Sequence, residues 1–170
     1  MNLLLTSSAF QDGNSVPVWY TRAEIDCSPP VGWAGVPDAA ESLALICSSR
    51  GGKGNVFYHW VVYNIPPDVH GLDGKQAKDP SLHKGICQSR NSAGGWGWEG
   101  PDINRRKILR FRLLALDAVL DEDGCGDPGR CVRSMEGHLL AEAALVGRVG
   151  NREERAGKRP VEGREQGEET

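Results

Sequence analysis

Short apolar runs separated by glycine and proline make up most of the first 150 residues. Residues 42–47 (SLALIC) and 60–65 (WVVYNI) are rich in apolar and β-branched residues and are bounded by turn-forming residues, which predicts core strands. Residues 109–113 (LRFRL) alternate strictly, so the apolar side chains share one face and Arg110 and Arg112 lie on the other. The pattern predicts a β-rich domain in which at least one strand has a wet side.

The C-terminal part of this region contains the one helix that the pattern favours. Residues 129–140 (GRCVRSMEGHLL) follow Asp127-Pro128, a pair typical of a helix N-cap and first turn, and we expect a helix there. Residues 143–149 either continue it or form a strand, and periodicity does not decide between the two. Residues 71–97 are loop-like, and a loop of this length in a small domain usually carries function.

A change in composition separates one folded unit from a charged tail. From Asn151 the chain reads NREERAGKRPVEGREQGEET, in which Val161 is the only large apolar residue. Such a segment buries too little surface to offset its ordering entropy, so we expect a folded domain over residues 1–150 and a disordered tail over 151–170. A chain of 170 residues with 39% hydrophobic content is sized for one such domain.

Charge and hydropathy narrow the classes of partner. The formal net charge is -3 and acidic and basic residues are interleaved, so we expect neither nucleic acid nor an anionic membrane surface as a partner. The first ten residues lack the basic and apolar regions of a signal peptide, and no stretch approaches roughly 18 uninterrupted apolar residues. We therefore expect no membrane insertion and a cytoplasmic location, while a homodimer and a protein partner stay open.

The five cysteines are odd in number and lack CxxC spacing, which indicates neither a disulfide framework nor a zinc site. We expect reduced, mostly buried thiols, although Cys125 and Cys131 flank a Gly/Asp/Pro loop and could be bridged in an oxidising setting. GGKG at residues 51–54 lacks the rest of a Walker pattern, and no familiar catalytic motif occurs. The sequence therefore indicates no metal and no cofactor.

Two side chains are candidates for chemistry. His59 lies where the Gly-rich segment 48–55 leads into FYHWVVYNIP, and an imidazole at a strand entry is available to a cavity. Taken alone, such a residue is more often a core histidine satisfied by a backbone carbonyl. Asp26 precedes a Ser-Pro-Pro turn, where it either orients an imidazole or caps its own backbone. In residues 91–101 (NSAGGWGWEGP), two tryptophans and several glycines either wall a pocket or form an ordered surface loop.

Taken together, these segments resemble the phosphatidylethanolamine-binding protein family, in its bacterial, Raf kinase inhibitor-like branch, from about Thr6 to Arg148. The family's motifs are matched in order at residues 7–13 (SSAFQDG), 16–21 (VPVWYT), 26–37 (DCSPPVGWAGVP), 57–66 (FYHWVVYNIP), 91–101, 113–117 (LLALD) and 134–149 (SMEGHLLAEAALVGRV). The resemblance implies a mainly β fold with a large central sheet, a smaller sheet packed on it and one or two C-terminal helices. It also implies a small pocket for anions such as phosphoryl head groups, with His59 as a pocket histidine.

The chain departs from the family at the pocket itself. Residues 49–53 (SRGGK) replace the family's DPDAP, whose aspartate lines the pocket, and Lys107-Ile108-Leu109 replaces its HRY. Only His59 of the usual polar side chains is kept. Arg50, Lys53 and Lys107 make the pocket more cationic if they point inward, and leave it less polar if they face water.

Two hypotheses for the function follow. In the first, the protein is a non-catalytic binding protein for an anionic or polar-headed small molecule. The expected ligand-binding residues are His59, Trp60, Asn91, Gly94, Trp98 and Lys107. In the alternative, the pocket is remodelled into a cofactor-free isomerase, cyclase or lyase acting on an organic metabolite. There His59 is the general acid or base, and Asp26 orients it or accepts a proton, with Glu99 a further candidate.

Overall fold

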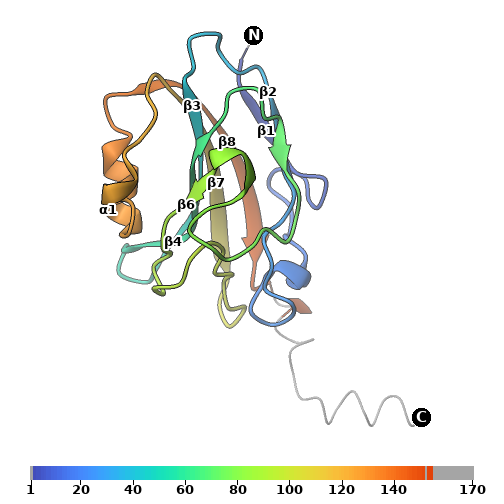
Figure 1. Ribbon diagram of the computed structural model, residues 1–170. Coiled ribbons are helices and arrows are strands. Elements are labelled where there is room, and N and C mark those ends of the chain that lie inside the picture. The colour runs from blue at the N-terminus through green and yellow to red at the C-terminus, as the bar shows by residue number, and fades with distance from the viewer. Residues whose placement is uncertain (1, 152, 155–170) are drawn as a thin grey trace, which may run out of the picture.

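Two antiparallel β-sheets of unequal size face one another (Figure 1), in a computed structural model that describes residues 2–151 and 153–154. The larger sheet runs in the order β6 (Cys87–Gln88), β4 (Val56–Ile65), β3 (Ser42–Arg50), β7 (Lys107–Leu116), β8 (Leu139–Val149). The smaller sheet runs in the order β1 (Leu4–Thr6), β2 (Val31–Ala34), β5 (Gly71–Leu72). The predicted mainly β architecture, with a large sheet and a smaller packed one, is confirmed.

The main core lies between the two sheets. Alternate residues of each long strand point to this inner face, because side chains alternate along a strand. On β7 these residues include Leu109, Phe111 and Leu113, and all three are fully buried. Trp33 and Leu72 of the smaller sheet close the same core. The alternation predicted for residues 109–113 is therefore confirmed.

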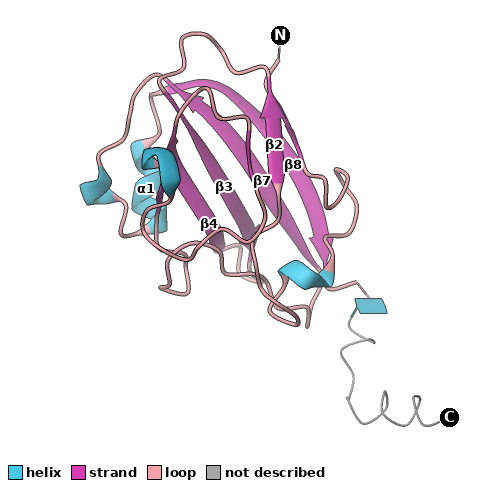
Figure 2. Cartoon of the chain, turned by 45° about the vertical axis from the view of Figure 1, so that its right-hand side comes forward, coloured by secondary structure: helices cyan, strands magenta, loops and turns pink. Residues whose placement is uncertain are grey.

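The helix α1 (Pro128–Ser134) covers part of the outer face of the large sheet (Figure 2). A second apolar cluster lies beneath it, in which Cys131 and Met135 pack with Ile46 and Val61 of the sheet. Three 3-10 turns complete the elements: η1 (Val18–Tyr20), η2 (His83–Gly85) and η3 (Glu122–Gly124). Only one end of the outer face is covered in this way.

The predicted helix begins where expected and ends too early. The carboxylate of Asp127 accepts a hydrogen bond from the Gly129 amide, and Pro128 occupies the first turn, as the sequence indicates. The expected end at residue 140 is wrong, because Gly137 adopts φ +85°, a left-handed conformation that ends the turn after α1. β8 then begins at Leu139 and pairs along β7, so residues 143–149 form a strand.

The long loop, the cysteines and the C-terminal tail can each be compared with the sequence-based predictions. Residues 71–97 are mostly loop, with β5, η2 and β6 as short elements within it. All five cysteines are free thiols and buried. The expected tail lies outside the described residues except at residues 151, 153 and 154. Among the residues described, no helix is long and apolar enough to cross a membrane.

Candidate functional site

His59 lies at a β-bulge between β3 and β4. Cys47 pairs with Trp60 while Ser48 pairs with Tyr58, so His59 is an extra residue with no partner opposite it. A bulge of this kind re-aims the side chain of the extra residue. The His59 ring turns toward the inner face, where it is 2% exposed and within 2.7 Å of the Ser49 hydroxyl.

Hydrogen bonds fix the orientation and tautomer of the His59 ring. Nδ1 lies 2.8 Å from the carbonyl oxygen of Glu99, which only accepts, so Nδ1 carries the proton. The Glu99 amide in turn donates to the His59 carbonyl at 2.9 Å, which makes a reciprocal clamp between the two residues. With Nδ1 protonated, Nε2 of the neutral ring accepts the hydrogen bond from Ser49. The imidazole is therefore held as a hydrogen-bond acceptor toward Ser49.

The environment keeps this imidazole neutral. The pKa of His59 is lowered from 6.5 to about 4, chiefly by burial and also by the nearby charges of Lys107 and Arg22. The Glu99 carbonyl and the charge of Asp26 act in the opposite direction and do not offset the burial. At neutral pH, His59 can accept a proton but has none to give from Nε2.

Aromatic rings pack around His59 and close the inner face. The ring centroid of Phe57 lies 4.7 Å from that of His59, and Trp98 lies 6.3 Å away. Trp98 stacks on Phe111 and meets Trp60 edge-on at 5.8 Å. Both tryptophans are buried, with their indole N–H groups bonded to the Gln88 side chain and the Tyr20 carbonyl. Both lie in the main core between the sheets.

A polar cluster lies within electrostatic range of His59. Arg22 Nη2 and Lys107 Nζ each lie 3.1 Å from the same oxygen, Oδ2 of Asp102. Glu99 adds a looser ion pair to Arg22 at 3.7 Å. Partial burial opposes ionisation of Asp102, but hydrogen bonds from Lys107 and the Asn104 amide and the charge of Arg22 outweigh it and hold its pKa below the usual value. Two cations thus converge on one partly exposed carboxylate.

Asp26 is near His59 without bonding to it. Its Oδ1 accepts a hydrogen bond from the Gly100 amide at 2.7 Å, and its Oδ2 lies 3.6 Å from Lys78 Nζ. The residue itself has φ 57°, in the left-handed region. Asp26 therefore anchors the loop after Trp98, while the Glu99 carbonyl orients the imidazole.

Asn91 and Gly94 belong to a different part of the molecule. The Asn91 side chain bonds to the Gly97 carbonyl and to the amides of Ala93 and Gly95, so it closes its own loop. Both residues border a cavity of about 460 Å³ on the side of Tyr58 and α1. The structure thus brings together His59, Trp60, Trp98 and the cation Lys107, and places Asn91 and Gly94 elsewhere.

Arg50 and Lys53, the two other basic residues at positions where the chain differs from the family pattern, lie outside this site. Arg50 is exposed on the outer face of the large sheet, where it donates to the Gly54 carbonyl, and Lys53 is exposed in the turn between β3 and β4. Of the three basic residues, only Lys107 reaches the polar cluster. No group of three or more metal-ligating side chains occurs in the described part of the chain.

The sequence analysis did not identify three residues of this site: Ser49, Arg22 and Asp102. For Ser49 a signal existed, because alternation along β3 puts it on the same face as the buried Cys47. For Arg22 and Asp102 there was none, since they come from irregular segments 80 residues apart in the chain. Only the folded structure brings these two together.

Comparisons with known proteins agree with this fold. The sequence profile of the phosphatidylethanolamine-binding protein family matches residues 6–150. A UPF0098 protein of Methanothermobacter thermautotrophicus is 40% identical over 147 residues, which are 84% of this chain and 95% of the relative. The crystal structure of a phosphatidylethanolamine-binding protein homologue from Chlamydia trachomatis is similar with a TM-score of 0.75 and 29% identity, over 88% of this chain and 98% of that one.

A second solved structure shows the same fold at lower identity. Escherichia coli YbcL, described as a member of the mammalian family, is similar with a TM-score of 0.78 and 21% identity, over 89% of this chain and all of that one. The family profile spans nearly all of the described residues, and this relative aligns over most of its own length. The chain therefore belongs to the phosphatidylethanolamine-binding protein family.

Proposed function

We propose that the protein is a non-catalytic binding protein for a small anionic or polar-headed molecule, held beside His59 by Arg22 and Lys107. The observation that carries this proposal is the convergence of both cations on Asp102 Oδ2, at 3.1 Å each. A carboxylate in this position has the charge and the acceptor oxygens of an anionic head group. An incoming anion would replace Asp102 as the partner of the two cations.

The roles of the polar groups follow from what each can donate. Arg22 and Lys107 supply charged donors, which form the stronger hydrogen bonds to anions. The Ser49 hydroxyl is committed to His59, and the imidazole is neutral, so this pair adds little positive charge. His59 then acts by holding Ser49 and the Glu99 segment in place beside the cations. This assignment moves the anion-binding role from His59 to its neighbours.

Removing the competing carboxylate tests the proposal. Inorganic phosphate and phosphoethanolamine should bind Asp102→Asn about fivefold more tightly than the wild type, and Lys107→Gln about fivefold more weakly, since an exposed pair of charges contributes about 1 kcal/mol. Isothermal titration calorimetry gives both constants. Asp68→Asn removes an exposed carboxylate on the β4–β5 connection and should bind as the wild type does. Equal affinities of the wild type, Asp102→Asn and Lys107→Gln would rule the site out.

The Ser49–His59 hydrogen bond favours an enzyme as a second candidate. A hydroxyl 2.7 Å from an imidazole whose other nitrogen is anchored to a carbonyl has the arrangement of a nucleophile or proton donor with its base. With a pKa of about 4, His59 serves only as a base near pH 7. Any turnover of an organic metabolite through this pair should rise through pH about 4 and disappear in Ser49→Ala. Activity retained by that variant would contradict the enzymatic candidate.

A further inference from the structure

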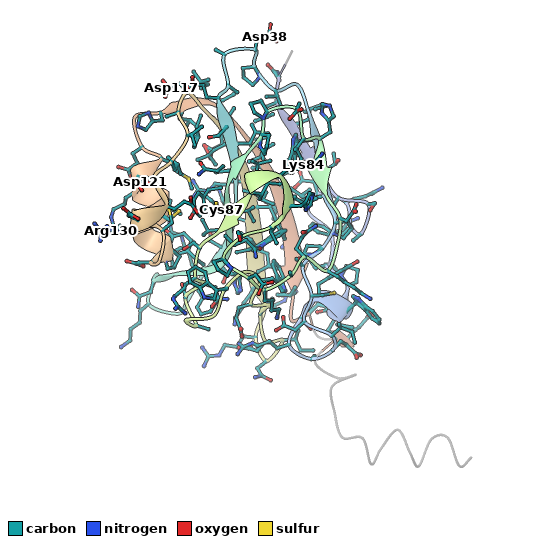
Figure 3. The ribbon with its side chains drawn as sticks, viewed as in Figure 1. Asp38, Lys84, Cys87, Asp117, Asp121 and Arg130 are labelled. Carbon is teal, nitrogen blue, oxygen red and sulfur yellow. The ribbon has the colours of Figure 1, made fainter. Side chains whose placement is uncertain are left out.

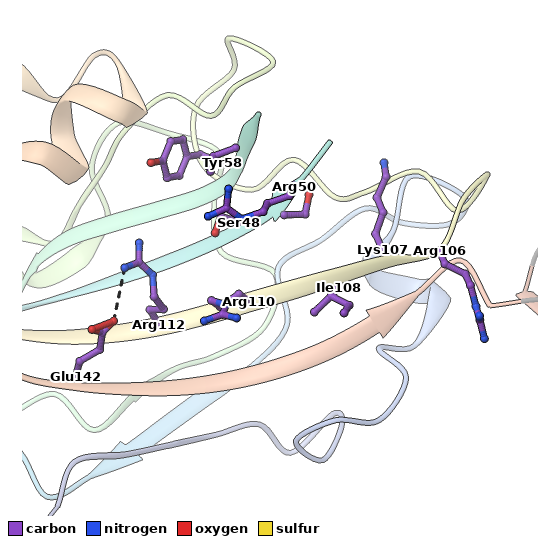
Figure 4. Close-up of a pocket in the computed structure, with 11 residues that line it drawn as sticks. Ser48, Arg50, Tyr58, Arg106, Lys107, Ile108, Arg110, Arg112 and Glu142 are labelled. Atoms are coloured by element: carbon purple, nitrogen blue, oxygen red, sulfur yellow. Dashed lines mark ion pairs between the residues drawn. The ribbon is translucent and has the colours of Figure 1, made fainter. Parts of the chain in front are cut away.

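The outer face of the large sheet holds a second group of polar side chains, opposite to the His59 side. Beyond the end covered by α1, strands β3, β4 and β7 form the floor of a groove of about 650 Å³ (Figure 4). Its central lining residues are Ser48, Arg50, Tyr58, Ile108, Arg110 and Arg112. These side chains come from the wet faces of strands whose other faces build the main core.

Positive charge predominates in this groove. Arg50, Arg106, Lys107, Arg110 and Arg112 line it together with one carboxylate, Glu142. Glu142 pairs with Arg112 at 3.6 Å, so it offsets only one of the four guanidinium groups. Like charges this close on one sheet face repel one another, and an anion bound among them would remove that repulsion.

Arg110 is the centre of the group. It lies opposite Ser48 in the β3–β7 pairing and two residues from Arg112 on the same face of β7, about 7 Å along the strand. Arg50 follows on β3, two residues beyond Ser48, and donates to the Gly54 carbonyl. Within the described residues, the side chain of Arg110 makes no hydrogen bond and no ion pair. A planar guanidinium with free donors, beside a hydroxyl and two further arginines, suits a group with several acceptor oxygens.

Apolar surface borders the arginines. Ile108 is 51% exposed and Val56 is 41% exposed, and the Tyr58 ring forms the side toward α1. The mixture fits a ligand with an anionic end and a compact apolar or aromatic body.

We propose that this groove binds a phosphate-bearing small organic molecule, with the phosphoryl group at Arg110 between Arg50 and Arg112 and the organic part against Tyr58 or Ile108. Ser49 and Lys107 of the site beside His59 also line this groove, but the proposed phosphoryl contacts are outward residues of β3 and β7, and neither His59 nor Arg22 lines the groove. It does not depend on the proposed function.

A small ligand is favoured over a polyanion by the borders of the groove. Asp127 lines the adjoining cavity on the far side of Tyr58 together with Arg90 and Arg133, and Asp121, Glu122 and Asp123 are exposed in the segment before it. An extended nucleic acid or an anionic membrane would have to cross this negative segment, whereas a small molecule stays within the groove.

Titration with 1-naphthyl phosphate tests the proposal, followed by calorimetry and by NMR of the arginine side chains. We expect saturable binding that shifts the resonances of Arg50, Arg110 and Arg112, and an affinity at this site that is at least about tenfold lower in Arg110→Gln. Arg130→Gln is the matched control, since Arg130 is exposed on α1 and does not line the groove (Figure 3). 1-Naphthol, which lacks only the phosphoryl group, should not saturate.

Arg22→Gln separates this site from the one beside His59. Binding that survives in Arg22→Gln and is lost in Arg110→Gln supports the groove even if the proposed function fails. The proposal is overturned if binding is lost only in Arg22→Gln, or if naphthyl phosphate does not saturate at millimolar concentration. It is also overturned if RNA or phosphatidylglycerol vesicles bind through Arg110 while naphthyl phosphate does not.

Discussion

The surroundings of His59 determine the protonation state of its imidazole and the hydrogen bonds that it can make. Histidine ordinarily titrates near neutral pH, but burial lowers the pKa of this ring to about 4. Its two nitrogens are occupied by the Glu99 carbonyl and the Ser49 hydroxyl. His70, by contrast, is exposed to solvent. The His59 ring is therefore a fixed neutral acceptor at neutral pH.

This low pKa makes the stability of the fold depend on pH. Between pH 6.5 and 4 the unfolded chain binds a proton at His59 that the folded chain does not, so stability falls as the pH drops through this interval. The wild type should lose about 3 kcal/mol more than His59→Gln between pH 6.5 and 4, and the difference should become constant well above pH 6.5. Urea unfolding at a series of pH values measures it. His70→Gln should follow the wild type, and parallel curves for wild type and His59→Gln would contradict the assignment.

At the scale of elements, the bulge in β4 and the loop after Trp98 form one unit. The extra residue in β4 frees the His59 carbonyl to accept from the Glu99 amide, while Glu99 holds the imidazole. Gly100 follows directly, with its amide bonded to Asp26. The strand and the loop therefore hold each other in position. A change in the loop conformation alters the position of His59 through its hydrogen bonds with Glu99.

Gly100→Ala should break this unit. An added Cβ would clash with Asp26 Oδ1 and would lie 2.6 Å from the Tyr20 carbonyl oxygen, so the loop must shift. We expect a loss of about 1–3 kcal/mol in the free energy of unfolding, typical of overpacking, and a rise of the His59 pKa toward its usual value. Thermal unfolding and NMR titration of the imidazole measure the two effects. Gly95→Ala is the control, because its Cβ would meet Asn91 Nδ2 at an ordinary 3.6 Å, and an equal loss in both variants would contradict the mechanism.

At the scale of the whole molecule, the local patterns predict the layers better than the site. Alternation over residues 109–113 and the apolar run at 42–47 depend on neighbours in the chain, so the sequence reveals which face each residue takes. The end of the helix was misjudged because pairing of β8 with β7 overrides the local helical pattern. The family resemblance supplied the sheet arrangement that no local pattern contains.

The site needed information that no single segment holds. The bulge at His59 arises from the mismatch of two strands, and its extra residue breaks the alternation that would otherwise predict the direction of the side chain. Arg22 and Asp102 meet across a long separation in the chain. The resemblance predicts His59 and Trp98 as site residues and a departure from the family pattern points to Lys107, whereas the ion pairs that hold the cations appear only in three dimensions.

The alternation along β7 also disfavours misfolded forms in which the strands pair out of register. β7 pairs with β3 on one side and with β8 on the other, so its register fixes three strands at once. A slip by one residue would bring Arg110 and Arg112 into the space between the sheets and expose Phe111 to water. Because burying unpaired charges is very costly, such misregistered forms cannot persist. The arginines therefore select the native register whether or not any ligand occupies the groove.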